Sequence, residues 1–192
     1  MNDTEKFVVV LDANVLYPAP LRDFFLRLAE TGLYIPKWSD EIHDEWIRNL
    51  LLKRPDLKEA QLNRARQAMD SAFPDSNVAG FKSLIAGLSL PDSGDRHVLA
   101  AAIKCGARMI ITFNKKDFPA KHVKTFNLEI KNPDEFVMLL LKVNQPKVLH
   151  ALRRQVSALK NPPQSREQVL SSLKKCGLAQ SGGMLAAAPG LA

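Results

Sequence analysis

Two short runs without a polar face constrain the fold of this chain most. The first is FVVVL, from Phe7 to Leu11, and the second lies in RMIITFN, from Arg108 to Asn114. A strand that is apolar on both sides must be covered on both faces, which is typical of a parallel sheet layered between helices. Segments with helical spacing alternate with these runs, so we predict an α/β fold with a mainly parallel central sheet flanked by helices.

Further elements are predicted from caps, breakers and periodicity. Ser39 is expected to cap a helix whose first turn is acidic, and Ser165 and Gln168 form a capping box at the start of another. Gly32 and Gly106 are expected to end helices. The other expected helices are Pro20–Glu30, a segment from Pro55 to Phe73, Asp92–Cys105 and a helix that starts at Pro133. We expect LYIPKW to be extended and NLEI to form another strand.

Charge divides the chain at Pro146. Of a net charge of +7, the segment 146–192 carries +6, because it holds seven Lys or Arg residues and a single acid, Glu167. We predict a main domain over 1–145, a basic appendage of two helices over 146–178, and a disordered tail over 179–192, where Gly, Ala and Pro dominate. Two short helices bury little alone, so they should pack on the main domain or on a partner. A basic appendage suits a nucleic-acid partner, and a solvated helix surface is the alternative.

Composition narrows the class of protein. Hydrophobic residues make up 46% of the chain, which is ordinary for a globular protein. No apolar run approaches the ~20 residues that span a bilayer, and the first six residues lack the order of a signal peptide. Cys105 and Cys176 lie far apart without metal-binding spacing. We therefore expect reduced thiols, a cytoplasmic protein and no membrane partner.

Four acids are expected to meet at one edge of the sheet. Asp12 directly follows the first strand, and Asp117 follows the strand in RMIITFN. Ligand crevices of open α/β sheets lie at the carboxyl ends of the strands. Asp95 begins the alanine-rich helix, and Glu45 lies beside the apolar stripe of the helix capped by Ser39. Each acid also has a structural interpretation, as a helix cap, a turn residue or a surface acid.

A divalent cation would make such a cluster tolerable. Several carboxylates in a cleft repel one another, and oxygen-only ligands favour Mg²⁺ or Mn²⁺. His97 is interpreted as a packing or surface residue rather than as a ligand. Oxygen-bound divalent ions commonly serve phosphoryl chemistry. A phosphatase would want a second acid where this chain has Asn14, and a receiver domain would want an acidic pair that the chain lacks.

The motifs together resemble those of PIN-domain ribonucleases. The segments that carry the resemblance are VVLDANVLYP, WSDEIHDEWIRNL, LPDSGDRHVLAAAIKCGARMIITFNKKDFP and NPDEFV, roughly over residues 6–142. The series is most similar to the VapC-like toxins of bacterial toxin–antitoxin systems. The resemblance implies a three-layer PIN-like fold, and it implies that Asp12, Glu45, Asp95 and Asp117 hold Mg²⁺, or Mn²⁺, and carry the catalysis.

The same resemblance implies further roles and partners. Asn14, Asp92, Thr112 and Asn114 would support the acids. Cations near the acids would contact substrate phosphates, and the local candidates are Arg48, Lys115, Lys116 and Lys121. The implied function is metal-dependent hydrolysis of RNA phosphodiester bonds by a toxin that forms a homodimer and is restrained by an antitoxin. A housekeeping PIN nuclease and a non-catalytic RNA-binding module are the alternatives.

Overall fold

The computed structural model describes residues 7–188, and its centre is a four-stranded parallel sheet in the order β2-β1-β3-β4. The strands are β1 (Phe7–Leu11), β2 (Tyr34–Lys37), β3 (Met109–Ile111) and β4 (Glu129–Lys131). Each neighbouring pair is parallel, with Val9 opposite both Pro36 of β2 and Met109 of β3. The predicted α/β fold with a parallel sheet is confirmed.

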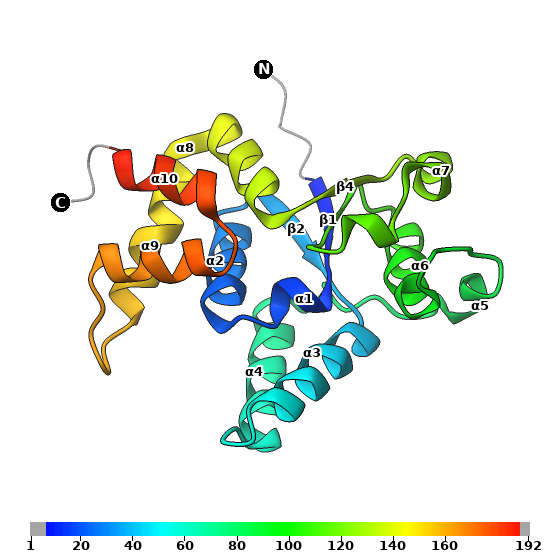
Figure 1. Ribbon diagram of the computed structural model, residues 1–192, viewed down its shortest axis with the longest axis horizontal. Helices are drawn as coiled ribbons and strands as arrows, with labels where there is room; N and C mark the ends of the chain where they lie inside the picture. Colours follow the sequence, from blue (N-terminus) through cyan, green and yellow to red (C-terminus); the bar gives the residue numbers. More distant parts are fainter. Residues whose placement is uncertain (1–6, 189–192) are drawn as a thin grey trace.

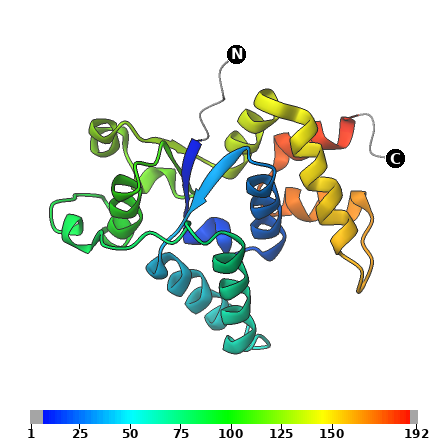
Figure 2. The same cartoon turned by 180° about the vertical axis from the view of Figure 1, so that it is seen from behind.

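Helices cover both faces of the sheet and its carboxyl edge. They are α1 (Ala13–Leu16), α2 (Ala19–Glu30), α3 (Asp40–Lys53), α4 (Glu59–Ala72), α5 (Lys82–Ile85), α6 (Arg96–Lys104), α7 (Ala120–Val123), α8 (Pro133–Ala158), α9 (Arg166–Lys175) and α10 (Ala179–Ala187). Figure 1 shows α2 and α8 on one side of the sheet and α6 on the other, and Figure 2 shows the same layers from behind. Helices α1, α3 and α4 lie below the ends of the strands in Figure 1.

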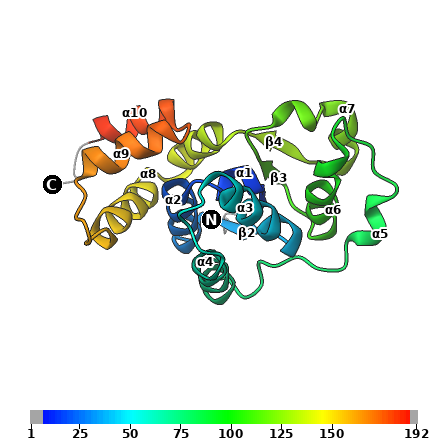
Figure 3. The same ribbon diagram turned by 60° about the horizontal axis from the view of Figure 1, so that its bottom comes forward.

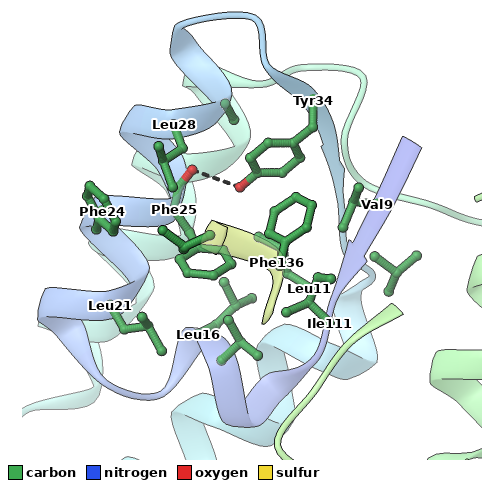
Figure 4. Close-up of a cluster of buried hydrophobic side chains, with 14 of the residues drawn as sticks. Val9, Leu11, Leu16, Leu21, Phe24, Phe25, Leu28, Tyr34, Ile111 and Phe136 are labelled. Carbon is green, nitrogen blue, oxygen red and sulfur yellow. Dashed lines mark hydrogen bonds between the residues drawn. The ribbon is translucent and has the colours of Figure 1, made fainter. Parts of the chain in front are cut away.

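The core lies between the sheet and the α2–α8 layer. Figure 4 shows apolar side chains of α2, β1, β2 and β3 around Phe136 of α8. The Phe136 ring meets that of Tyr34 edge-on, with centroids 5.1 Å apart. The Tyr34 hydroxyl donates a 2.8 Å hydrogen bond to the carbonyl of Phe25, so this buried polar group is satisfied. This packing fixes the directions of β1 and β3, whose ends carry the acids.

Most predicted elements form where local signals placed them. Ser39 caps α3 by accepting a hydrogen bond from the backbone N–H of Ile42, and Ser165 caps α9 by accepting one from Gln168. The four-residue helices α1, α5 and α7 are too short to show helical periodicity in the sequence. Among the described residues, no helix has both the length and the hydropathy needed to cross a bilayer.

The expected break near Pro146 is a kink inside α8. Asn144 has non-helical backbone angles, and its side-chain Oδ1 accepts a hydrogen bond from the Lys147 N–H. Asn144 thus caps the second half of the helix, where Pro146 sits in the first turn and needs no N–H donor. Two helices are therefore joined end to end, and the domain boundary at 145/146 stays a prediction.

The prediction of disorder from Ala179 is wrong for the described part of that segment. Residues 179–187 form α10, which packs on α8 and α9 (Figure 3). Small residues make this packing possible, because a Cβ added to Gly182 would come within 2.8 Å of Lys174 Cγ. The Gly- and Ala-rich composition that suggested disorder is in fact a close-packing surface. The remainder of the predicted tail, like the first six residues, lies outside the described residues.

Candidate active site

Parallel strands bring Asp12 and Thr112 together at the carboxyl edge of the sheet. Asp12 is the first residue after β1, and Thr112 is the first after the neighbouring β3. The Asp12 N–H donates a 3.1 Å hydrogen bond to the Ile111 carbonyl, which extends the strand pairing to this point. Both residues are fully buried or nearly so. The parallel strands thus bring together two residues that are 100 positions apart in the chain.

A network of donors holds the Asp12 carboxylate. Its Oδ2 accepts hydrogen bonds from Thr112 Oγ1 at 2.6 Å and from Asn14 Nδ2 at 2.7 Å. Its Oδ1 accepts one from the Ala13 N–H at 2.7 Å. A carboxylate offers about four lone-pair sites, so one site on Oδ1 remains for a further ligand. Asn14 and Thr112 therefore orient Asp12, as the resemblance implied.

Helix α3 delivers Glu45 to the same region, where it meets His97 of α6. His97 Nε2 lies 3.3 Å from Glu45 Oε2, and the His97 side chain is largely buried. The interpretation of His97 as a packing residue missed this pairing, because α3 and α6 are far apart in the sequence. The other ring nitrogen of His97, Nδ1, is buried and has no hydrogen-bond partner within residues 7–188.

Asp92, Asp95 and Asp117 complete the cluster from two 3-10 turns, η1 (Ser93–Asp95) and η2 (Lys115–Asp117). Asp92 Oδ1 accepts a 2.7 Å hydrogen bond from the Gly94 N–H and caps η1. Asp95 makes no such cap to α6. Its Oδ2 is buried without a hydrogen-bond partner in the part of the chain that the structure describes. A buried carboxylate oxygen of this kind is an available ligand.

Mutual repulsion and burial are visible in the pKa values of two acids. Burial raises the pKa of Asp12 to about 6, with a further increase from the charge of Glu45, although the Thr112 hydrogen bond opposes the shift. Burial also raises the pKa of Asp95 to about 7, and the charges of Asp12, Asp92, Asp117 and Glu45 raise it further. The charges of the other three predicted acids, Asp12, Glu45 and Asp117, therefore all act on Asp95. We call Asp12, Glu45, Asp95 and Asp117 the acidic edge.

The chemistry of the acidic edge fits a divalent cation. No three His, Cys, Asp or Glu side chains of residues 7–188 are arranged to hold an ion between them. Mg²⁺, however, usually keeps several waters and takes only one or two carboxylates directly. The open lone pair of Asp12 Oδ1 and the Oδ2 atom of Asp95, which has no hydrogen-bond partner within residues 7–188, would supply such ligands. The negative charge of the neighbouring acids would also favour a cation. A hollow of about 410 Å³ beside them, lined by residues that include Glu45, leaves room for water.

The predicted phosphate contacts differ in their surroundings. Arg48 is exposed and lines the hollow, and Lys116 and Lys121 are also exposed. Lys115 Nζ instead forms hydrogen bonds of 2.8 and 2.9 Å with the Glu135 carboxylate, so a phosphate would have to compete with this acid.

Asn114 contributes through its main chain. Its backbone N–H donates a 2.9 Å hydrogen bond to Thr112 Oγ1, and this bond positions the hydroxyl that Thr112 offers to Asp12. Its side chain makes no cap to η2. The supporting role of the Asn114 side chain stays a prediction.

Family models match most of this architecture. The PIN domain model matches residues 8–116, which is more than half of the chain. The chain therefore belongs to the PIN-domain family, and the resemblance seen in its motifs is confirmed. A second model, the VapC50 C-terminal domain, matches residues 133–187, which include α8, α9 and α10.

One curated protein is similar over about half of the chain. It is named "Putative ribonuclease VapC50", from Mycobacterium tuberculosis, and it is 32% identical over 94 residues. That match covers 49% of this chain and 55% of the relative, so it spans little more than half of the relative's length. No solved structure was found to match the chain.

Proposed function

We propose that this protein is a metal-dependent endoribonuclease that hydrolyses RNA phosphodiester bonds in the cytoplasm. The observation that carries the proposal is the gathering of acids at the carboxyl edge of the sheet, where burial, with a further contribution from neighbouring acids, raises the pKa of Asp12 to about 6 and that of Asp95 to about 7. These carboxylates repel one another, and Asp95 Oδ2 is buried without a hydrogen-bond partner within residues 7–188. Such a group of acids is suited to binding a cation.

The residues of the proposed site have two roles: some would bind the metal ion, and others position the carboxylates that bind it. Asp12 and Asp95 would hold Mg²⁺, or Mn²⁺, and Glu45 and Asp117 would contact it directly or through water. When bound, the ion lowers the pKa of a water molecule and screens charge on the phosphoryl oxygens. Thr112 and Asn14 fix the Asp12 carboxylate, and His97 fixes Glu45, as partners that orient ligands commonly do.

The test is cleavage of a mixed RNA by the purified full chain. Cleavage should require Mg²⁺ or Mn²⁺, stop on addition of EDTA, and disappear in Asp12→Asn. The matched control is Asp134→Asn, which removes an acid of α8 that hydrogen-bonds α10 rather than the acidic edge. If Asp12→Asn cleaves as fast as the wild type in a nuclease-free preparation, the assignment of the acidic edge is wrong.

We also propose that the nuclease is the toxin of a toxin–antitoxin pair. The match of its C-terminal helices to the VapC50 C-terminal domain and the name of the curated relative support this proposal. The acidic edge would attract an arginine side chain of an antitoxin, because guanidinium pairs bidentately with carboxylates.

The wild-type chain should slow bacterial growth, Asp12→Asn should not, and a protein encoded nearby should restore growth by binding. A housekeeping nuclease would cleave RNA without slowing growth. The predicted homodimer is tested by light scattering.

A further inference from the structure

Two exposed phenylalanines lie at opposite ends of the sheet. Phe113 is 40% exposed and Phe126 is 39% exposed. Phe113 follows Thr112 at the carboxyl end of β3, beside the acidic edge. Phe126 precedes β4 and lines a hollow with Arg108 and Glu129. Arg108 and Glu129 lie at the amino ends of β3 and β4, away from the acidic edge. The two side chains have the same chemistry and exposure, so their positions alone distinguish them.

The backbone of Phe113 is tied to the residues that orient Asp12. Its N–H donates a 3.1 Å hydrogen bond to Asn14 Oδ1, and the Nδ2 of the same Asn14 donates to Asp12. The neighbours on either side, Thr112 and Asn114, are joined by the bond between the Asn114 N–H and Thr112 Oγ1. Phe113 therefore cannot shift without disturbing the network around Asp12.

The turn between α9 and α10 supports the Phe113 ring from one side. Gly177 has a φ of 100°, in the region that favours glycine. A Cβ added there would lie 2.7 Å from Phe113 Cε1 and 3.1 Å from Cζ, so the ring edge rests on bare backbone. Figure 1 shows this turn close to α1, which begins at the acidic edge. The last two residues of α9, Lys174 and Lys175, directly precede this turn and are both exposed.

We propose that Phe113 is a stacking platform for one base of the RNA substrate beside the cleaved bond, with Gly177 as its support. Aromatic side chains next to a cationic surface bind single-stranded nucleic acid by stacking, whatever the base. The Phe113 ring rests against Gly177 and is partly open to solvent. Phe113 directly follows Thr112, which donates a hydrogen bond to Asp12. The C-terminal helices would thus contribute to substrate binding through a buttress as well as through charge. The inference rests on the proposed ribonuclease function.

The experiment measures RNA binding in the full-length Asp12→Asn chain, which should bind without cleaving. The probe is an oligoribonucleotide that the wild type cleaves once, with abasic nucleotides placed in turn around the cleaved bond. In this background Phe113→Leu should weaken binding about tenfold, whereas Phe113→Tyr should bind within about twofold of the parent. The matched control Phe126→Leu should leave binding unchanged. One abasic position should weaken binding to the parent about tenfold and have no further effect on Phe113→Leu.

The outcomes separate the two proposals. If the wild type cleaves but Phe113→Leu binds like the parent, or every abasic position affects both chains equally, stacking is overturned and the ribonuclease stands. Conversion of a dimer to a monomer by Phe113→Leu, with unchanged RNA binding per chain, would show that the ring serves a protein interface instead. Thermal melts of each variant identify any loss of folding, and recovery of binding in Phe113→Tyr would count against a purely structural role. If the wild type cleaves no RNA with either metal ion, both proposals fail.

Discussion

The acidic edge and the C-terminal helices meet at Phe113 and Gly177, but their aspartates are paired differently. At the acidic edge, burial and like charge raise the pKa of Asp12 and Asp95, and Asp95 Oδ2 has no partner within residues 7–188. In the C-terminal helices, Asp134 accepts hydrogen bonds from the backbone N–H groups of Gln180 and Ser181. At the other end of α10, Arg166 donates to the Leu185 carbonyl.

The difference shows where the fold is complete by itself. The C-terminal helices satisfy the ends of α10 with side chains of α8 and α9, which is ordinary stabilisation of a helix by capping. The acidic edge keeps charge that its own residues do not balance. Such unbalanced charge is typical of functional sites, because a ligand that binds there removes the cost. The following predictions test this contrast, from the largest expected effect to the smallest.

Deletion of residues 146–192 should abolish folding of the remaining chain. Val148, Leu152 and Leu173 are fully buried in the same hydrophobic cluster as the β1 and α2 residues. Each large apolar side chain contributes about 1.5–3 kcal/mol when buried, and the whole domain is stable by only about 5–15 kcal/mol. The measurement is a thermal melt followed by circular dichroism. A cooperative melt of the truncated chain would contradict this prediction. It would support the boundary at 145/146 that the charge pattern of the sequence suggests.

Leu173→Ala provides the graded version of this deletion. It should lower the free energy of unfolding by about 2–5 kcal/mol, because a fully buried leucine is lost without a new partner. Metal-dependent cleavage should persist below the melting temperature. A loss of cleavage in the folded variant would show that α9 shapes the acidic edge more directly than its packing indicates.

Asp12→Asn should reduce cleavage by about a thousandfold or more, since a metal contributes several kcal/mol to the barrier. Its effect on stability should be small, because two changes oppose each other. A buried charge disappears, but the new amide places an N–H₂ group against donors such as Asn14 Nδ2. Denaturant unfolding without metal measures the balance. A large loss of stability would mean that the Asp12 network is structural rather than catalytic.

The metal-free protein should become less stable as the pH rises from about 5 to about 8. Both folded pKa values, about 6 for Asp12 and about 7 for Asp95, exceed the ordinary value of 3.8. The folded chain therefore binds more protons than the unfolded chain in this range, and stability is lost as these protons leave. Asp12 alone corresponds to about 3 kcal/mol, lost as the pH passes through about 6.

Chemical denaturation across this pH range measures the slope. Saturating Mg²⁺ should flatten it, because a bound cation favours the charged carboxylates. Asp12→Asn should also have a shallower slope, while Asp134→Asn should keep the slope of the wild type. A metal-free stability that increases towards pH 8 would contradict the unbalanced charge at the acidic edge.

Asp134→Ala should destabilise the protein by about 1–2 kcal/mol, as expected for the loss of a capping carboxylate. Asp134 Oδ1 accepts from the Ser181 N–H at 2.8 Å, and Oδ2 accepts from the Gln180 N–H at 2.9 Å. Asp134→Asn keeps one acceptor and should lose less. The readout is hydrogen exchange, which should increase in α10 and not in α6. Unchanged exchange in α10 would show that packing of Gly182 alone holds this helix.

Local signals in the sequence predicted much of this structure. The two apolar runs form β1 and β3, and the capping signals at Ser39 and Ser165 begin α3 and α9. The strand-end rule led us to expect Asp12 and Asp117 at one edge of the sheet, and the structure places Asp12 beside Thr112 there. Helix α10 could not be predicted, because small residues carry no helical periodicity and their packing depends on Lys174 of a neighbouring helix.

Pairings between helices were also beyond the sequence. Glu45 and His97 lie on α3 and α6, and Lys115 and Glu135 lie on η2 and α8. Nothing in the spacing of these residues indicates that they touch. The sequence could therefore nominate His97 and Lys115 for other roles, and only their neighbours in space showed which groups they contact.

The sequence by itself determined the parallel sheet, its helical layers and the end of the sheet at which the acids gather. These features depend on side-chain period, capping and strand direction, which are properties of short segments. Only the tertiary structure decided that Asp95 Oδ2 has no hydrogen-bond partner among the described residues, that α10 is a packed helix and that Gly177 supports Phe113. Those contacts join segments far apart in the chain, and their distances depend on how closely whole helices approach one another.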